Sequence, residues 1–571
     1  MRRALAFALL AAACAPAPLP PTGHVLLFFD TDAPVPEAVG EAAPAPAGVA
    51  ALDVQPLFDR LEVEVFEPGA TSPCEGCRRE FVLDRRTLAE LRASIQVPAR
   101  PGVAGYRARA RLFLAAHLVD GGGPPSSSTV EVVAALPIAP AEGAAEATLL
   151  LATDDVGAPR GTLGAPTPLI DGRPAGSRVG TWLGAAKRDC ASPPRAGEVC
   201  VPGGAFWMGR PGERAALPEN DADLARLVVV SPHFLDADEA TVGDVRAFEK
   251  GEVGFIAWSQ ATTGASTRDY CSFTATPGAR DTLPANCMLW TAARHFCLSR
   301  GKDLPTEAQF EHAASALAAR RFPWGDDPPA CDDAVWGRGG AGYLAPILAP
   351  CRARALTLGP DCVGDACAGS RRRDSLTLRG GVIRDLAGNV SEWALDRFNR
   401  QDEACWSAAG PRRDPLCTLP GGGGVQLAVR GGSWLASGGA LAASARAAQD
   451  LDTFQPFTGF RCARPDGGRC GKLKPGLYSG ATRGGDAGTL LTVGVGCSGV
   501  VSVVGGHRDN NPFFLVGAID RGDQVVLDGA DSFAPKVAQR FVGQVVDSEH
   551  MEGTWTSGDG KSGTWSVGPK P

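Results

Sequence analysis

Cysteine is the residue type in this sequence that is most able to do chemistry, with 17 copies in 571 residues. Cys74 and Cys77 form a Cys-x-x-Cys pair, a spacing used by zinc sites, redox centres and small disulfide loops. A zinc site needs four ligands, but the chain has no second such pair and only seven scattered histidines. A redox centre needs a βαβ context, which the neighbouring sequence does not predict. We therefore predict a local disulfide between Cys74 and Cys77.

Cys14 has a different setting, because it ends an apolar segment. Two arginines follow Met1, and Ala4–Ala13 is an apolar run about half as long as the ~20 residues that span a bilayer. The run closes as Leu10-Ala11-Ala12-Ala13-Cys14, which matches a lipobox, the signal for attaching lipid to the cysteine thiol. The alternative is a plain secretory signal peptide cut after Ala-x-Ala, with Cys14 incidental.

A lipidated Cys14 predicts an exported bacterial lipoprotein of the cell envelope, with the membrane as a partner through its lipid. Residues 1–13 would be the signal peptide, and the proline-rich residues 14–23 an extended linker. Ala15, where an aspartate would retain the protein, predicts sorting to the outer membrane. No later run is apolar enough to span a bilayer. The other 16 cysteines would then lie in an oxidising compartment, so we expect mostly disulfides.

The charge balance argues against a nucleic-acid partner. The formal net charge is −7, and the arginines are dispersed rather than gathered into one basic face. A hydrophobic content of 44% and a charged content of 21% are typical of globular protein. The length predicts several domains rather than one core.

The secondary structure that would position a site differs along the chain. In residues 24–188, apolar and polar residues alternate as they do in β-strands. Leu61, Val63 and Val65 alternate with glutamates, and Arg107–Leu112 alternates arginine with apolar residues. Six or seven such short runs, separated by turn-rich segments, predict a β-sandwich.

Residues 471–571 show β periodicity again. Short apolar runs end in two copies of Gly-Thr-Trp, at Gly553–Trp555 and Gly563–Trp565, on either side of the turn signal Ser557–Gly560. This pattern predicts a small antiparallel meander or barrel.

The segment between these flanks, residues 195–465, combines helical stretches with glycine-rich irregular regions. Thr306–Gln309 has the pattern of a capping box, which predicts a helix from there to about Ala318. With its flanks, this segment predicts an α+β chain.

Seven stretches of the central segment carry motifs. In chain order they are Val201–Gly209, His233–Phe248, Trp290–Ala313, Phe322–Gly325, Leu386–Trp393, Arg430–Trp434 and Gly459–Cys462. In this order they resemble the formylglycine-generating-enzyme, or sulfatase-modifying-factor, domain family. The resemblance covers about half of the chain and implies a fold related to C-type-lectin-like domains, with little regular structure.

The resemblance also implies what the chain lacks. The best-known members oxidise a sulfatase cysteine to formylglycine with oxygen and copper(I), which two thiolates hold. These thiolates lie three and eight residues after the serine that here is Ser433, at Ala436 and Leu441. Neither residue can bind copper, because soft metal ions of this kind need sulfur ligands. We therefore expect no copper and no catalytic residue at these positions.

Two further features follow from the resemblance. The family pairs the cysteines that here are Cys297 and Cys462, so we expect that disulfide. Its ion-binding loop supplies a side-chain oxygen, two main-chain carbonyls and a glutamate, which fall on Asp385, Gly388, Val390 and Glu392. Hard oxygen ligands of this kind suit calcium. The alternative is that Glu392 only caps and packs a turn.

Three functions remain open. The first is a non-catalytic scaffold that binds an envelope protein or glycan, with Ser433, Trp434 and Arg446 lining a ligand cleft. The second is a formylglycine-generating oxidase that acts on protein cysteine. The third is a nucleophilic triad at Ser433, which we discount because neither the sequence nor the resemblance brings a histidine near it. The missing thiols favour the first.

Overall fold

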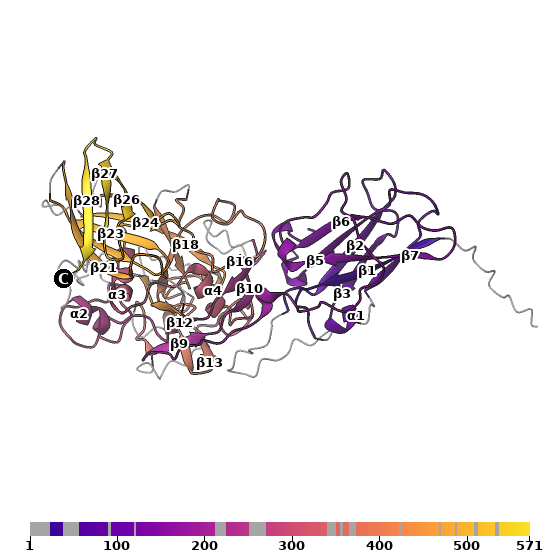
Figure 1. Cartoon of the computed structure of the whole chain (residues 1–571). Helices are drawn as coiled ribbons and strands as arrows, with labels where there is room; N and C mark the ends of the chain where they lie inside the picture. Colours follow the sequence, from indigo (N-terminus) through magenta and orange to yellow (C-terminus); the bar gives the residue numbers. More distant parts are fainter. Residues whose placement is uncertain are drawn as a thin grey trace, which may run out of the picture.

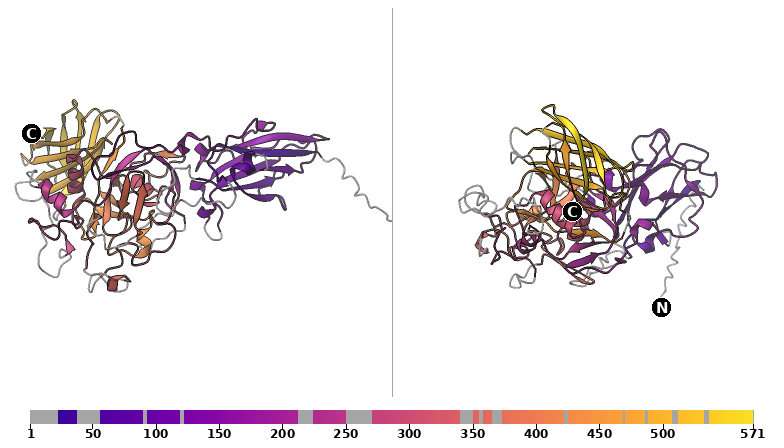
Figure 2. Two further views of the ribbon diagram at one scale, coloured as in Figure 1. Left: turned by 90° about the horizontal axis from the view of Figure 1, so that it is seen from below. Right: turned by 60° about the vertical axis from the view of Figure 1, so that its left-hand side comes forward.

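The computed structural model describes most of the chain in three parts (Figure 1). The described residues are 23–37, 56–89, 93–118, 122–211, 224–249, 270–339, 350–354, 358–364, 373–421, 425–467, 470–485, 488–506, 512–531 and 536–570. The predicted signal peptide, the linker up to residue 22 and Cys14 lie outside them. In Figure 1 and the left view of Figure 2, an N-terminal β-domain and a C-terminal barrel lie on opposite sides of the central domain.

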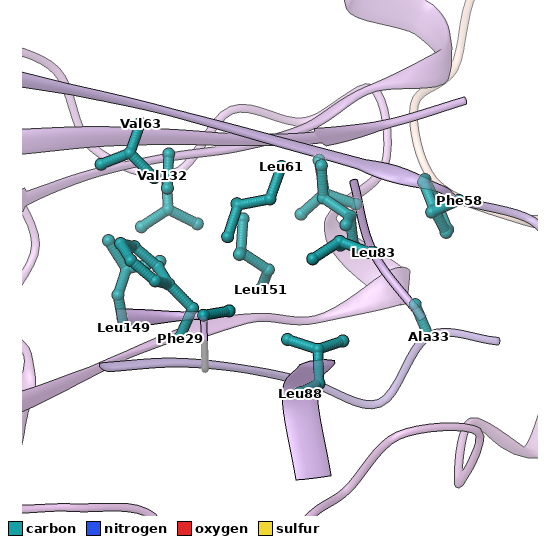
Figure 3. Close-up of a cluster of buried hydrophobic side chains, with 14 of the residues drawn as sticks. Phe29, Ala33, Phe58, Leu61, Val63, Leu83, Leu88, Val132, Leu149 and Leu151 are labelled. Atoms are coloured by element: carbon teal, nitrogen blue, oxygen red, sulfur yellow. The ribbon is translucent and has the colours of Figure 1, made fainter. Parts of the chain in front are cut away.

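The N-terminal domain consists of two four-stranded sheets that share one hydrophobic core. One sheet has the order β4-β1-β7-β8, with bounds Ser94–Val97, His24–Thr31, Ala144–Leu151 and Ile170–Asp171. The other has the order β3-β2-β5-β6, with bounds Arg78–Val82, Arg60–Phe66, Arg107–Phe113 and Val130–Ala135. A short helix, α1 (Arg85–Ala89), lies beside them. Figure 3 shows Leu61 and Val63 of β2 pointing into the core toward Phe29 and Leu149 of the facing sheet. This arrangement agrees with the predicted β-sandwich.

The charged residues that alternate with this apolar face pair with one another on the opposite face of the sheet, where Glu62 and Glu64 are buried. Arg109 Nε donates to Glu64 Oε2 at 2.7 Å, and Arg111 Nη1 donates to Glu62 Oε1 at 3.0 Å. β2 and β5 are antiparallel neighbours, so opposite charges directly across the pair stabilise the register.

Trp207 joins the sandwich to the central domain. Its indole Nε1 donates to the Leu57 carbonyl at 2.8 Å, and the rings of Phe58 and His117 meet it edge-on at 5.5 and 4.8 Å between centroids. Trp207 belongs to the same apolar cluster as the sandwich core, so the two domains share buried surface. Burial, followed by the charge of Arg210, lowers the pKa of His117 to about 4, so this imidazole is neutral at pH 7.

The central domain is built from small sheets and short helices. Its sheets have the orders β10-β11-β16, β20-β12-β9, β13-β14 and β18-β17-β15-β19. The strand bounds are Glu198–Val201 (β9), Gly204–Met208 (β10), Arg226–Val230 (β11), His233–Asp236 (β12), Ser375–Leu378 (β13), Gly381–Arg384 (β14), Ser391–Arg397 (β15), Arg412–Arg413 (β16), Gln426–Arg430 (β17), Arg446–Asp450 (β18), Thr458–Gly459 (β19) and Ala463–Pro465 (β20). Its α-helices are α2 (Val242–Glu249), α3 (Trp290–Ser299) and α4 (Glu307–Ala314). The chain is thus mostly β with few helices. The finer assignment, α+β and C-type-lectin-like, stays a prediction.

The capping box predicted for α4 is present, but the helix is shorter than expected. Thr306 Oγ1 accepts from the Gln309 backbone at 3.1 Å, and Gln309 Oε1 accepts from the Thr306 backbone at 2.9 Å. The helix ends at Ala314 rather than near Ala318. Ala316 and Leu317 have φ of 54° and 58°, in the left-handed region that cannot continue a right-handed helix.

The disulfide predictions are confirmed where they can be followed. Cys74 is bonded to Cys77, and Cys297 of α3 is bonded to Cys462 across 165 residues. Further pairs are Cys190–Cys200, Cys271–Cys287, Cys331–Cys351, Cys405–Cys417 and Cys470–Cys497. Every cysteine in the described part of the chain is in a disulfide.

The C-terminal domain is a closed barrel of eight antiparallel strands, which resolves the predicted alternative of meander or barrel. The strand bounds are Gly476–Arg483 (β21), Leu490–Val495 (β22), Val500–Gly506 (β23), Pro512–Ile519 (β24), Gln524–Asp531 (β25), Ala538–Val545 (β26), Met551–Ser557 (β27) and Ser562–Pro569 (β28). Large rings fill the space left by inward glycines. A Cβ on Gly505 would lie 2.1 Å from the Phe513 ring, and one on Gly543 would lie 2.5 Å from Trp565. The interior is therefore a packed core.

Arg294 of α3 fixes the barrel to the central domain. Its Nη2 donates to the Val500 carbonyl at 2.7 Å and its Nη1 to Ser502 Oγ at 2.9 Å, while Asp303 binds Nε at 2.8 Å. The guanidinium is fully buried, and Val500 and Phe514 of the barrel pack in one apolar cluster with Trp290 of α3. Among the described residues, no helix is both long enough and apolar enough to cross a membrane.

Candidate functional site

Two of the sequence motifs meet inside the central domain. Leu386–Trp393 leads into β15, and Arg430–Trp434 follows β17, its antiparallel neighbour. The Gly388 amide donates to the Gly431 carbonyl, and the Trp434 amide to the Asn389 carbonyl, each at 2.8 Å. The turn that follows β17 requires glycine. A Cβ on Gly432, whose φ is 69°, would lie 2.7 Å from the Ala440 carbonyl oxygen.

The two positions that the resemblance assigns to copper-binding thiolates lie in an apolar cluster. Ala436 and Leu441 pack in one group of side chains with Phe322 and Trp336, and Leu441 is completely buried. A methyl group and an isobutyl group offer no lone pair to a metal ion. Their cluster also holds the disulfide Cys331–Cys351, and disulfide sulfurs are not thiolates.

The structure does not form the expected ligand cleft from Ser433, Trp434 and Arg446. All three side chains are buried, with 3%, 0% and 3% of their surface exposed. The Trp434 indole donates to the Pro456 carbonyl at 3.1 Å. Arg446 instead binds Glu307, with both Nε and Nη2 at 2.6 Å from its carboxylate oxygens. The prediction was wrong because it assumed that residues in or near a motif lie at the surface. The polar groups of these residues instead have partners in the interior.

Arg446 belongs to a buried charge network that the sequence motifs did not indicate. Arg430 pairs with Glu311 and lies 3.7 Å from Glu307, and the Arg446 guanidinium packs over the ring of Phe398 at 4.9 Å. Glu311 also accepts from the Gly209 amide at 2.6 Å. These contacts hold α4 against β17 and β18. The only signal in the sequence was the pair of glutamates one turn apart on the apolar helix.

Asp396 lies next to this network, and its pKa is strongly raised. Its Oδ2 accepts from the Glu307 amide and its Oδ1 from the Cys417 amide, each at 2.8 Å. Burial, followed by the charge of Glu307, raises the pKa of Asp396 to about 7. By contrast, Arg446 holds the pKa of Glu307 below its ordinary value despite the effect of burial.

In the loop that is predicted to bind calcium, an arginine binds the glutamate. Arg461 Nε lies 2.8 Å from Glu392 Oε2, and Arg461 Nη2 donates to Glu392 Oε1 at 2.6 Å and to the Asp385 carbonyl at 3.0 Å. Next to it, Glu239 accepts from the Val390 amide at 3.1 Å. Burial and the charges of Asp385 and Glu392 raise the pKa of Glu239 well above its ordinary value.

Calcium could bind Glu392 only in competition with Arg461. The described residues contain no group of three or more histidine, cysteine or acidic side chains that could hold a metal ion. The predicted set has only two such side chains, Asp385 and Glu392, and its other members, Gly388 and Val390, are carbonyl ligands. The calcium site therefore stays a prediction, in which the ion would compete with Arg461 for Glu392.

Comparison with known proteins points to the same part of the chain. Residues 184–465 match a family described as the sulfatase-modifying factor enzyme 1-like domain. A formylglycine-generating enzyme of Thermomonospora curvata is 28% identical over 308 residues, which cover 47% of this chain and 93% of that protein. A formylglycine-generating enzyme of Streptomyces coelicolor is 27% identical over 318 residues, 49% of this chain and 93% of that protein. Among solved structures, PvdO from Pseudomonas aeruginosa is similar over 47% of this chain and 94% of its own, with 19% identity and a TM-score of 0.32.

Proposed function

Because residues 184–465 belong to the sulfatase-modifying factor enzyme 1-like domain family, we propose that this chain uses the family's domain as a non-catalytic binding scaffold. Its ligand would be a protein or glycan of the bacterial cell envelope, where a lipid on Cys14 would anchor the chain, at the outer membrane. Copper would play no part.

One observation carries this proposal. The two positions where the family's oxidases hold copper(I) are Ala436 and Leu441, and Leu441 is buried in an apolar cluster. Soft metal ions are selected by thiolate ligands, and the described cysteines are all in disulfides. A shifted pair of thiols is therefore not available among the residues that the structure describes.

The construction of the molecule supports a scaffold role. Five disulfides join pairs of described residues in the central domain, and a packed barrel and a sandwich are joined to it by buried contacts. A rigid body of this kind binds a partner with little loss of conformational entropy.

A formylglycine-generating oxidase is the second candidate, because both curated relatives carry that name. Identity of 27–28% is compatible with either activity, so the substitutions at the two thiolate positions decide our preference.

The test is conversion of a sulfatase-type cysteine peptide by the purified full chain, with and without copper(I). We expect no aldehyde product and no stoichiometric copper(I) binding. The matched variant carries Ala436→Cys together with Leu441→Cys, and copper(I) binding by this variant alone would support the assignment of the two positions. Repeated turnover by the unmodified chain would refute the proposal. An affinity capture from solubilised envelope, compared with the chain lacking residues 184–465, would then identify the ligand.

A further inference from the structure

Arg397, the last residue of β15, is a buried arginine that lacks the partners such residues normally have. Only 3% of its surface is exposed. Its Nη1 donates to the Thr418 carbonyl at a long 3.5 Å. Its Nε and Nη2 are enclosed by protein and have no hydrogen-bond partner among the described residues. Arg446 and Arg461, which are equally buried, each bind a glutamate with two nitrogens.

Unpaired donors on a buried charge are costly. A guanidinium stays protonated in a protein, and removing it from water without acceptors costs far more than burying a neutral group. Burial lowers the pKa of Arg397, but not to a range where the charge is lost. A hydrogen-bond acceptor beside Nε and Nη2 would offset this cost.

A β-bulge lies in β15 just before Arg397. On β15, Trp393 pairs with Val429 and Arg397 pairs with Leu427, so four steps along β15 correspond to two along β17. This bulge redirects the end of the strand, and bulges of this kind are frequent beside functional sites.

The carboxylate whose charge acts on Arg397 is engaged elsewhere. Asp528, on β25 of the barrel, favours the charged form of Arg397. However, Asp528 Oδ1 accepts a hydrogen bond from Arg540 Nη1 at 2.9 Å, on the neighbouring barrel strand. Trp393 and Leu395, on the same strand as Arg397, pack in one apolar cluster with Phe514 and Val516 of the barrel. Val516 pairs with Asp528 on the next barrel strand. Arg397 therefore lies near the contact between the central domain and the barrel, and its Nε and Nη2 donors are unused.

We propose that Arg397 binds an oxyanion at the junction between the central domain and the barrel. The Nε–H and one Nη2–H of a guanidinium point in parallel, and they fit two oxygens of a carboxylate, a sulfate or a phosphate. Because both nitrogens are enclosed, the protein atoms around them have to shift when the anion enters. This site is separate from the positions that carry the proposed function and does not depend on it.

The test is thermal unfolding of the full chain in sodium sulfate, sodium phosphate and sodium acetate, each against sodium chloride of equal ionic strength. We expect a saturable rise in Tm with at least one oxyanion, because a ligand that binds only the folded state stabilises it. The acetate arm separates a carboxylate ligand from a tetrahedral anion. Sulfate also raises the Tm of proteins without binding to a site. A difference in the Tm rise between the unmodified chain and its variants therefore identifies site binding.

Arg397→Gln should weaken oxyanion binding about tenfold or more, since a charge-assisted hydrogen bond is lost. Arg400→Gln, which removes an exposed charge three residues away, is the matched control and should leave the titration unchanged. Asp528→Asn should tighten binding, because it removes a negative charge that repels the anion. The same titration for the unmodified chain and Arg397→Gln, or weaker binding in Asp528→Asn, would overturn the proposal. If Arg397→Gln does not fold, the Asp528→Asn titration still decides it.

Discussion

Arg446→Met should destabilise the chain strongly at neutral pH and only weakly at pH 5. In the folded protein Arg446 holds Glu307 with two bonds of 2.6 Å, and neither side chain is exposed. The variant keeps a side chain of comparable length against Phe398 but leaves Glu307 with Arg430 at 3.7 Å as its cation. Breaking a buried ion pair in this way typically costs about 3–5 kcal/mol.

Protonation of Glu307 limits that cost. Neutralising a carboxyl whose ordinary pKa is 4.5 costs about 1.4 kcal/mol per pH unit above that value, hence about 3.4 kcal/mol at pH 7 and about 0.7 kcal/mol at pH 5. In the variant the folded pKa of Glu307 lies above the unfolded one. The stability is therefore intact below pH 4.5 and is lost as the pH rises through the folded pKa.

Urea unfolding of the full chain at pH 5 and pH 7 measures this difference. Glu307→Gln combined with Arg446→Met should remove most of the pH dependence, and Arg400→Met, at an exposed position, should change little. An equal loss at both pH values would refute the reasoning, because it would mean that Arg446 acts by packing rather than by charge.

Three further outcomes are expected. Cys14→Ala should release the protein from membranes, since the lipid is the only anchor that the sequence predicts; retention after a carbonate wash would contradict the lipobox. Calcium should raise the Tm of the full chain and Glu392→Ala should abolish the rise, whereas identical melting in chelator and in excess calcium would remove the site. Asp396, with a folded pKa of about 7 against an ordinary 3.8, binds its proton more tightly when folded, so its contribution to stability falls as the pH rises from about 4 to 7. Asp396→Asn should flatten that slope in pH-dependent unfolding, and an unchanged slope would show that Asp396 does not cause it.

The sequence by itself determined the features that depend on neighbouring residues. Alternation in Leu61–Val65 predicted which face of β2 enters the apolar core, and Thr306 and Gln309 predicted the start of α4, because strand faces and caps are set within a few residues. The Gly-Thr-Trp copies and the turn between them predicted the last hairpin, in which Trp555 pairs with Gly563 and Gly553 with Trp565. The order of motifs predicted the family of the central domain and the Cys297–Cys462 disulfide.

Only the tertiary structure decided where the polar side chains of the central domain end up. Arg446 and Glu307 are 139 residues apart, so no local pattern relates them. Burial selects such partners, because a charge removed from water must find an opposite charge wherever the fold brings one close. For the same reason Ser433, Trp434 and Arg446 lie inside rather than in a cleft. Closure of the barrel was likewise decided only when β21 met β28, a pairing between the first and last strands of the domain.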